Sequence, residues 1–250
     1  MAVSIKSARE IELMREAGKR LAHVHQELGN AIRPGMSTLE VDALGEKLIR
    51  DCGCIPNFLH YNGYPASICV SVNDEVVHGI PKKDRYLKEG DIVSLDAGLI
   101  YKGYHSDAAR THAVGKVSEE AMKLMEVTKQ SFFEGIKMAK EGNYLFDISA
   151  AIDSYVSGFG YGIVRDLVGH GIGTALHEDP QIPNFSQKRK GVRLQAGMTL
   201  AIEPMVNAGT WQVNFLRDGW TVVTKDGSLS AHYENTILVT DGEPEILTLY

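Results

Sequence analysis

The chain has 250 residues, a formal net charge of −6 and a sequence pI of about 5.9. A chain of this length is at the upper end for one hydrophobic core and is also long enough for two fused halves. Its mild negative charge gives no reason to expect nucleic acid or an anionic membrane as a partner. No apolar run reaches the roughly 18 residues of a membrane span. The three cysteines, in a chain whose start lacks the apolar core of a signal peptide, predict reduced thiols in a cytosol.

A pair of amphipathic helices is predicted first. A capping box over residues 7–10 precedes apolar residues that recur at three- and four-residue steps as far as Ile32. A second box over 37–40 opens another helix, which closes near Gly53. An aromatic, loop-like stretch then becomes strand-like, and a loop that carries His78 follows it.

Residues 89–115 are predicted to form a hairpin. The first strand, 91–96, ends on Asp96, a turn follows over 98–103, and the second strand brings in Asp107. Paired antiparallel strands can set two carboxylates side by side, and such a pair in an apolar hairpin is costly unless a cation lies between them. The alternative is that Asp96 is a turn residue and Asp107 a solvated surface charge.

The same pattern then restarts. A helix is predicted from Ser118 to near Gly142, and a shorter one ends at 158–160. A glycine-flanked segment with two histidines, VGHGIGTALHEDP, comes next, and further strands are predicted over 199–203 and 236–239.

The sequences of the two halves can be aligned by adding a fixed number to the residue numbers of the first half. Adding 107 carries Asp96 to Glu203, and adding 127 carries Asp107 to Glu234; the change of offset implies about twenty extra residues, mostly loop, around 207–230. The offset of 107 also relates the glycine pairs Gly35 and Gly142, Gly53 and Gly160, and Gly90 and Gly197. Glycine coincidences alone would be a weak signal among 25 glycines, and acids that fall on acids at strand positions strengthen it.

This repeat predicts an α+β fold built from two halves, at about 1–116 and 117–250, that are related by a pseudo-two-fold axis. Each half contributes helices and a strand hairpin with two carboxylates. The strands are expected to form one curved antiparallel sheet that is backed by the helices.

Four acids would then converge in one pocket: Asp96, Asp107, Glu203 and Glu234. Four carboxylates repel one another strongly and hold protons unless cations are present, and two divalent ions would neutralise them. His170, with glycines on both sides, is a candidate neutral ligand. Carboxylates with one imidazole and no thiolate suit Mn, Fe(II), Co or Zn, and two ions close together lower the pKa of a shared water.

The chain closely resembles the type I methionine aminopeptidases of the pita-bread metallopeptidase superfamily, over essentially all of its length. The motifs that carry the resemblance are, in order, NDEVVHGIP, GDIVSLDAG, SDAARTHAVG, GHGIGTALHEDP, TLAIEPM and HYENTILVT. The resemblance implies a single catalytic domain that removes the N-terminal methionine from nascent polypeptides with a small second residue. It also implies a cytoplasmic monomer; ribosome docking and the identity of the metal stay open.

The resemblance implies a role for each metal-site residue. Asp107 and Glu234 would bridge both ions, Asp96 would chelate one, and His170 with Glu203 would complete the other. A hydroxide that bridges the two ions is expected to attack the scissile carbonyl.

Two further histidines and one acid are implied in catalysis. His177 would contact the scissile amide and steady the tetrahedral intermediate, and His78 would contact the amide beyond it. Glu203 would act as general base as well as ligand. Taken alone, either histidine would be better explained as a core or loop residue.

The methionine side chain needs an apolar, polarisable slot. By resemblance its lining residues are Tyr61, Tyr64, Cys69 and Trp220, although these could also be ordinary core residues. The chain departs from the family at two places, with Leu176 where an aromatic residue is common and Phe58 where a cysteine is common. Some relatives hold a monovalent cation through backbone oxygens at the positions of Asn73 and Ser230.

Other readings of the sequence remain open. A peptidase of the same fold that cuts Xaa-Pro bonds is one, although such relatives carry a whole preceding domain that this chain is not expected to have before Ser7. A pita-bread binding module that has lost its metals is another, but here all five ligand positions are intact. The chain itself begins Met1-Ala2, so we expect that it can remove its own first residue.

Overall fold

The computed structural model describes residues 3–249. Met1 and Ala2, on which the expectation of self-processing falls, lie outside them. The helices are α1 (Ala8–Ala31), α2 (Thr38–Asp51), the 3-10 helix η1 (Tyr61–Gly63), α3 (Glu119–Ile136) and α4 (Leu145–Ser157). The strands are β1 (Ile55–Pro56), β2 (Ile68–Val72), β3 (Glu75–Val77), β4 (Ile92–Tyr101), β5 (Tyr104–Ala113), β6 (Gly162–Ile163), β7 (Gly169–Gly171), β8 (Glu178–Ile182), β9 (Thr199–Ile202), β10 (Met205–Asn207), β11 (Val213–Phe215), β12 (Val222–Thr224), β13 (Ser230–His232), β14 (Glu234–Leu238) and β15 (Glu245–Ile246).

The predicted helices are present, with the predicted caps. Ser7 and Ser37 each form a complete capping box with the glutamate three residues later, at the starts of α1 and α2. Ser118 caps α3, which ends at Ile136, before the predicted end near Gly142. The residues between Ile136 and Gly142 instead form turns, and Lys140 makes an isolated parallel bridge to Thr240.

The hairpin is longer than the sequence predicted, and the predicted turn was wrong. β4 continues through residues 98–101, so that the turn consists of Lys102 and Gly103. Gly98 is needed inside the strand because a Cβ atom there would lie 2.2 Å from Asn57 Oδ1. A glycine that looked like a turn residue is therefore a point of close approach.

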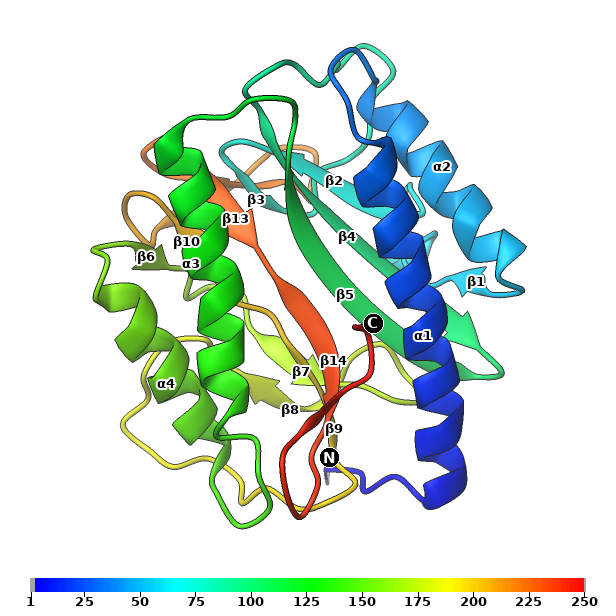
Figure 1. Cartoon of the computed structure of the whole chain (residues 1–250), viewed down its shortest axis with the longest axis vertical. Coiled ribbons are helices and arrows are strands. Elements are labelled where there is room, and N and C mark those ends of the chain that lie inside the picture. The colour runs from blue at the N-terminus through cyan, green and yellow to red at the C-terminus, as the bar shows by residue number, and fades with distance from the viewer. Residues whose placement is uncertain (1–2, 250) are drawn as a thin grey trace.

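The strands of both halves join in one antiparallel sheet. Within the described residues its order is β1-β4-β5-β14-β9-β7-β8, and β2 and β15 pair at the side with β4 and β14. Figure 1 shows α1 with α2 and α3 with α4 as two pairs over one face of this sheet, with β5 and β14 between them. β5 pairs with β14 at the centre, so the two halves meet strand to strand.

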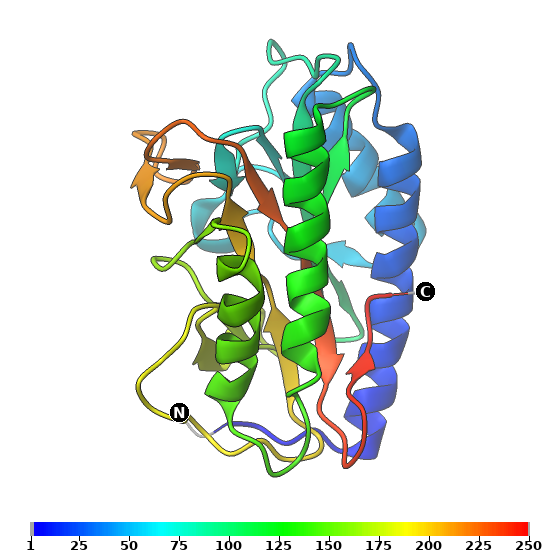
Figure 2. The same cartoon turned by 60° about the vertical axis from the view of Figure 1, so that its left-hand side comes forward.

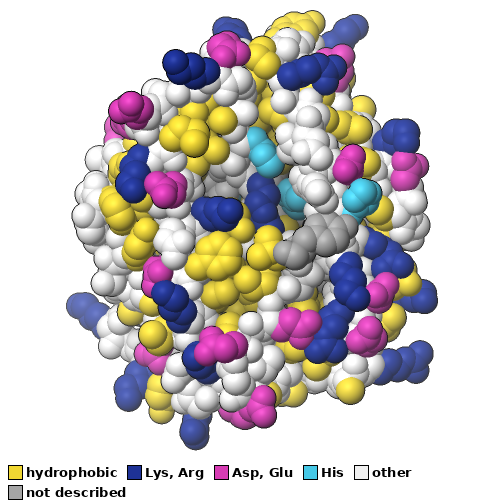
Figure 3. All heavy atoms as spheres, in the orientation of Figure 1, with side chains coloured by type: hydrophobic (Ala, Val, Ile, Leu, Met, Phe, Trp, Pro, Cys, Tyr) yellow, Lys and Arg dark blue, Asp and Glu magenta, His cyan; other side chains and the backbone are white. Residues whose placement is uncertain are grey.

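Each helix pair covers its own hydrophobic core. Leu21, Val41 and Leu95 are fully buried in the core beneath α1 and α2. Phe132 and Ile152 are fully buried in the core beneath α3 and α4. On the helical face acidic and basic side chains are interspersed (Figure 3). None of the helices in residues 3–249 is both long and apolar enough to cross a bilayer.

The backbone conformation repeats at the glycine pairs that the offset of 107 relates. Gly90 and Gly197 both have φ of +93°, a left-handed conformation that favours glycine. The other two pairs agree within 5°: Gly35 and Gly142 at +89° and +92°, and Gly53 and Gly160 at +70° and +75°. The pseudo-symmetry therefore extends to single backbone angles.

Two small sheets lie beside the main one, and the extra residues of the second half contribute the hairpin of the second. β13, β10 and β6 form one, and β11 and β12 form a hairpin that pairs with β3. β3 lies in the predicted loop before His78, where its strand conformation depends on this distant partner. In Figure 2 the hairpin projects away from the helical layer.

Candidate metal centre and its cavity

One cavity of about 210 Å³ is lined by all the residues that were predicted to act in catalysis, to bind metal or to form the methionine pocket. These are Tyr61, Tyr64, Cys69, His78, Asp96, Asp107, His170, His177, Glu203, Trp220 and Glu234. Residues far apart in the chain are therefore brought together at one place. The cavity also contains Phe58 and Leu176, the two positions at which the chain departs from the family pattern.

The first two acids are diagonal neighbours on one face of the hairpin. Asp96 on β4 is opposite Ala109, and Asp107 on β5 is opposite Gly98. His112, on the alternate face of β5, packs against α1 at Gly29. Asp107 therefore points to the side of the sheet away from that helix.

The register of the central strands puts the second pair of acids beside the first. Ala109 pairs with Asp96 on one side and with Glu234 on the other. Glu203 follows directly after β9, one position beyond the pairing of Ile202 with Asn235, so it is next to Glu234. Asp96, Glu234 and Glu203 thus lie in one row across the sheet.

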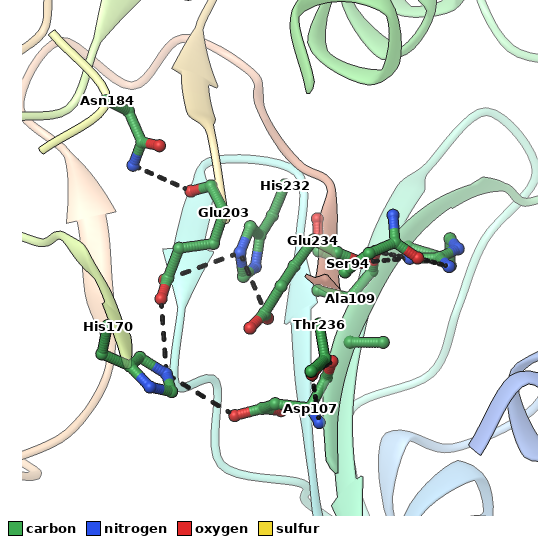
Figure 4. A network of polar contacts seen from close by, with 12 residues as sticks. Ser94, Asp107, Ala109, His170, Asn184, Glu203, His232, Glu234 and Thr236 are labelled. Atoms are coloured by element: carbon green, nitrogen blue, oxygen red, sulfur yellow. Dashed lines mark hydrogen bonds and ion pairs between the residues drawn. The ribbon is translucent and has the colours of Figure 1, made fainter. Parts of the chain in front are cut away.

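His170 reaches this row from β7, the strand beyond β9. Its Nε2 atom lies 3.8 Å from Asp107 Oδ2 and 3.7 Å from Glu203 Oε1 (Figure 4). Its Nδ1 atom lies 2.9 Å from the Gly171 carbonyl oxygen. A carbonyl only accepts hydrogen bonds, so Nδ1 carries the proton and Nε2 presents a lone pair to the acids.

Hydrogen bonds to the backbone hold the acids in place from behind. The Thr236 hydroxyl donates to the Asp107 carbonyl and accepts from the Asp107 N–H. Asn184 donates its amide to the Glu203 carbonyl, and Arg110 donates to the carbonyl of Glu234. The carboxylates are left free to face the cavity.

Burial makes this cluster electrostatically unfavourable without counterions. It raises the pKa of Asp96 to about 7 and raises the pKa values of Asp107, Glu203 and Glu234 well above the ordinary range. For the last three, repulsion from neighbouring carboxylates is the next cause. The acids can therefore be ionised together near neutral pH only if positive charge joins them.

The donor set fits divalent metal ions. Among residues 3–249, Asp96 Oδ1, Asp107 Oδ1 and Glu234 Oε1 are buried acceptors without a hydrogen-bond donor. One ligand atom from each of Asp107, His170 and Glu234 lies within 4.8 Å of the others. Unpartnered buried acceptors are costly, and oxygens with one imidazole suit hard to borderline cations.

Two more histidines face the same cavity. The ring of His177 is 4.4 Å from that of His170, centroid to centroid, and its Nδ1 is 2.7 Å from the Tyr61 hydroxyl. His78 has an unusual φ of +58°, and burial lowers its pKa to about 4. Both rings are neutral at pH 7 because burial lowers the pKa of His177 as well.

The apolar part of the cavity includes aromatic side chains. The Trp220 ring packs edge-on against Tyr64 with 5.1 Å between centroids, and Tyr64 donates its hydroxyl to the Gly79 carbonyl. Phe58 and Leu176 belong to the same buried cluster. The aromatic residue at 58 and the aliphatic residue at 176 thus shape one shared wall.

Several lining residues were missed from the sequence: Asn62, Val77, Leu167, Val168 and Met205. Met205 could have been found, because it closes the motif TLAIEPM two residues after Glu203. The others are ordinary residues that only their place in the fold brings to the cavity. His232 was also missed and lies beside the acids.

Asn73 and Ser230, the positions expected near a monovalent cation, are neighbours. The Ser230 N–H donates to the Asn73 carbonyl oxygen at 2.9 Å. Asn73 has φ of +59° and accepts from the Ile92 N–H through its side chain. The two residues tie β13 to the start of β4.

Comparison with known proteins agrees with this geometry. The sequence pattern of metallopeptidase family M24 matches residues 12–241. A methionine aminopeptidase of Clostridium acetobutylicum is 55% identical over 247 residues, which cover 99% of this chain and 99% of that protein.

Solved structures extend the likeness to the fold. A methionine aminopeptidase from Thermotoga maritima has a TM-score of 0.97 and 47% identity, with 100% of both chains covered. An Xaa-Pro dipeptidase from Bacillus anthracis has a TM-score of 0.77 and 26% identity over 98% of this chain and 61% of that one. The predicted pita-bread fold is confirmed.

Proposed function

The chain belongs to metallopeptidase family M24 and, within it, to the type I methionine aminopeptidases, and we propose that it hydrolyses the peptide bond after an N-terminal methionine. The substrates are nascent polypeptides whose second residue is small. The observation that carries the proposal is the convergence of acids from both halves, with unpartnered buried oxygens, on one aromatic-lined cavity.

Five residues would hold two divalent ions, chosen from Co, Fe(II), Mn and Zn. Asp96, Asp107, Glu203 and Glu234 would supply carboxylate oxygens, and His170 would supply its Nε2 atom. Bound there, such ions supply Lewis acidity and lower the pKa of water toward neutrality. The lone pair at His170 Nε2 supports its assignment, because the Gly171 carbonyl fixes the proton on Nδ1.

The remaining steps belong to side chains of this chain. Glu203 would take a proton from the attacking water and pass it to the leaving amine. His177 would steady the charge that develops on the scissile carbonyl oxygen, and His78 would hold the next amide. Support comes from the short bond of His177 to Tyr61, which orients the ring beside the acids.

The pocket would take the methionine side chain between Tyr61, Tyr64, Cys69 and Trp220. A thioether packs well against aromatic rings, and Cys69 offers a second polarisable sulfur. We also propose one monovalent cation near Asn73 and Ser230, where the loop before β3 meets the start of β13. A cytosolic monomer that acts on chains emerging from the ribosome is part of the same proposal.

Metal removal and restoration test the proposal. The protein is stripped with a chelator and then loaded with Fe(II), Mn, Co or Zn in turn. A Met-Ala-Ser peptide and an Xaa-Pro peptide serve as alternative substrates. We expect cleavage of the first only, in metal-loaded protein only, and a lower melting temperature after stripping, because ions that bind only the folded form stabilise it. Cleavage of the Xaa-Pro peptide alone would replace the proposed specificity, and inactivity with every metal would refute the proposal.

Substitution of Glu203 tests the proton transfer. Glu203→Gln should lower kcat by about a hundredfold or more, the usual contribution of a general base. Near-normal turnover with a full complement of metal would remove Glu203 from this role.

A further inference from the structure

His232 is a buried imidazole that none of the roles above uses. It ends β13, two residues before Glu234, and is only 1% exposed. Neither of its ring nitrogens has a hydrogen-bond partner within the described part of the chain. A buried polar ring without partners is costly, so its position calls for an explanation.

The ring faces two acids of the metal centre at once. His232 Nε2 lies 3.9 Å from Glu203 Oε2 and 3.9 Å from Glu234 Oε2. His170 lies at the other oxygen of Glu203, Oε1. Figure 4 shows the result: the Glu203 carboxylate stands between two imidazoles, one at each oxygen.

We propose that His232 is a positioning residue that donates its Nε2–H to the Oε2 atoms of Glu203 and Glu234 when metal is bound. This leaves Oε1 of Glu203 for the side of His170. The inference rests on the metal site proposed above. The distances of 3.9 Å exceed hydrogen-bond length by less than about 1 Å, which small torsions of two glutamate side chains can close.

The contrast with His170 favours a donor over a further metal ligand. In His170 a carbonyl at Nδ1 fixes the proton there and frees Nε2. Nothing in residues 3–249 accepts a proton from Nδ1 of His232. Two carboxylate oxygens at equal distance from Nε2 attract the proton to that nitrogen, because it then points at negative charge.

The expected consequence is tighter metal binding. A neutral donor shared by two acids offsets part of their mutual repulsion and restricts their rotation. Substitution of a residue that supports metal ligands in this way typically lowers metal affinity or activity by about 10- to 100-fold. His232 would thus act on both glutamates of the second half and on neither aspartate of the first.

A matched pair of variants tests this. His232→Gln keeps an N–H donor on a side chain of similar length, and His232→Met has nearly the same shape without a donor. His112→Met is the control, because that ring faces α1 on the other side of the sheet. Metal-free protein is titrated with Co(II) by calorimetry, and the absorption spectrum of bound Co(II) is recorded.

We expect Co(II) to bind about tenfold or more weakly to His232→Met, and within about threefold of the unsubstituted protein to His232→Gln and His112→Met. The Co(II) spectrum of His232→Gln should be unchanged. If His232→Met does not fold, His232→Leu takes its place.

Two outcomes would overturn the inference. Equal affinity in the Gln and Met variants would mean that no donor is needed. A changed Co(II) spectrum in His232→Gln would mean that His232 is itself a ligand. Failure of the unsubstituted protein to bind Co(II) at all would instead refute the metal site, so the two failures are distinguishable.

Discussion

The two halves share a backbone frame but connect their acidic strands differently. In the first half a turn at Lys102 and Gly103 joins β4 directly to β5. In the second half the whole segment from β10 to β13 separates β9 from β14. The acids nevertheless reach one row of the sheet, because β5 and β14 pair with each other at its centre. A fold can therefore vary a connection freely if the strands that carry its site still pair.

The two halves also share equivalent backbone hydrogen bonds. Leu87 N–H donates to the Met36 carbonyl, and 107 residues later Leu194 N–H donates to the Asn143 carbonyl, both at 2.8 Å. The long connection of the second half supplies what the first half lacks: Trp220 for the pocket and His232 beside the acids.

The largest expected effect comes from the equivalent acids Asp107 and Glu234. If both halves hold the metal equally, Asp107→Asn and Glu234→Gln should each lose bound metal and lower kcat/KM by more than about a hundredfold, beyond the usual cost of removing a supporting residue. Metal content by mass spectrometry and peptide cleavage measure this. Retention of metal by only one variant would show that the halves contribute unequally.

The equivalent glycines Gly90 and Gly197 separate backbone strain from packing. Alanine at either requires a left-handed conformation, which costs roughly 1–2 kcal/mol. Gly197→Ala should cost about 1–3 kcal/mol more, because its Cβ would lie 2.8 Å from Ile5 Cγ2, whereas a Cβ at Gly90 would meet only the Lys116 carbonyl oxygen, at 3.9 Å. Urea unfolding of the two variants measures the difference, and equal destabilisation would contradict the packing argument.

The contribution of the long connection of the second half to substrate binding can be tested at Trp220. Trp220→Ala should raise KM for a Met peptide about tenfold, roughly 1.4 kcal/mol of binding, with kcat changed much less. Phe215→Ala is the control, because Phe215 lies on the same hairpin but is 63% exposed. A similar rise in KM in both variants would mean that the hairpin as a whole matters, and not the indole.

The smallest expected effect is a difference in stability between variants of two equivalent helix N-caps, Ser37 of α2 and Tyr144 of α4. Ser37 accepts from the Glu40 N–H through its side chain, whereas Tyr144, at the same place before α4, makes no such bond. Ser37→Ala should cost about 1 kcal/mol, and Tyr144→Ala less than about 0.5 kcal/mol. Thermal unfolding compares them, with unchanged Co(II) affinity expected in both. Equal losses would mean that the helices are stabilised by the acids three residues after each cap, Glu40 and Asp147.

Local signals in the sequence were sufficient to predict the helices, although not the end of α3. Capping boxes and three- to four-residue periodicity located α1 and α2, since these features depend only on neighbours along the chain. The offset of 107 residues paired glycines that the structure places at nearly equal left-handed φ angles, a conformation that favours glycine. The motifs then named acids and histidines that all line one cavity.

Contacts between distant segments decided the rest. Gly98 lies inside β4 because Asn57 approaches the strand there too closely for any larger residue. Residues 75–77 form the strand β3 because β12 pairs with them. His232 lies beside Glu203 because β13 pairs with β10, a pairing that its own motif does not encode. Such features depend on pairs of residues far apart in the chain, whose proximity exists only once the sheet has formed.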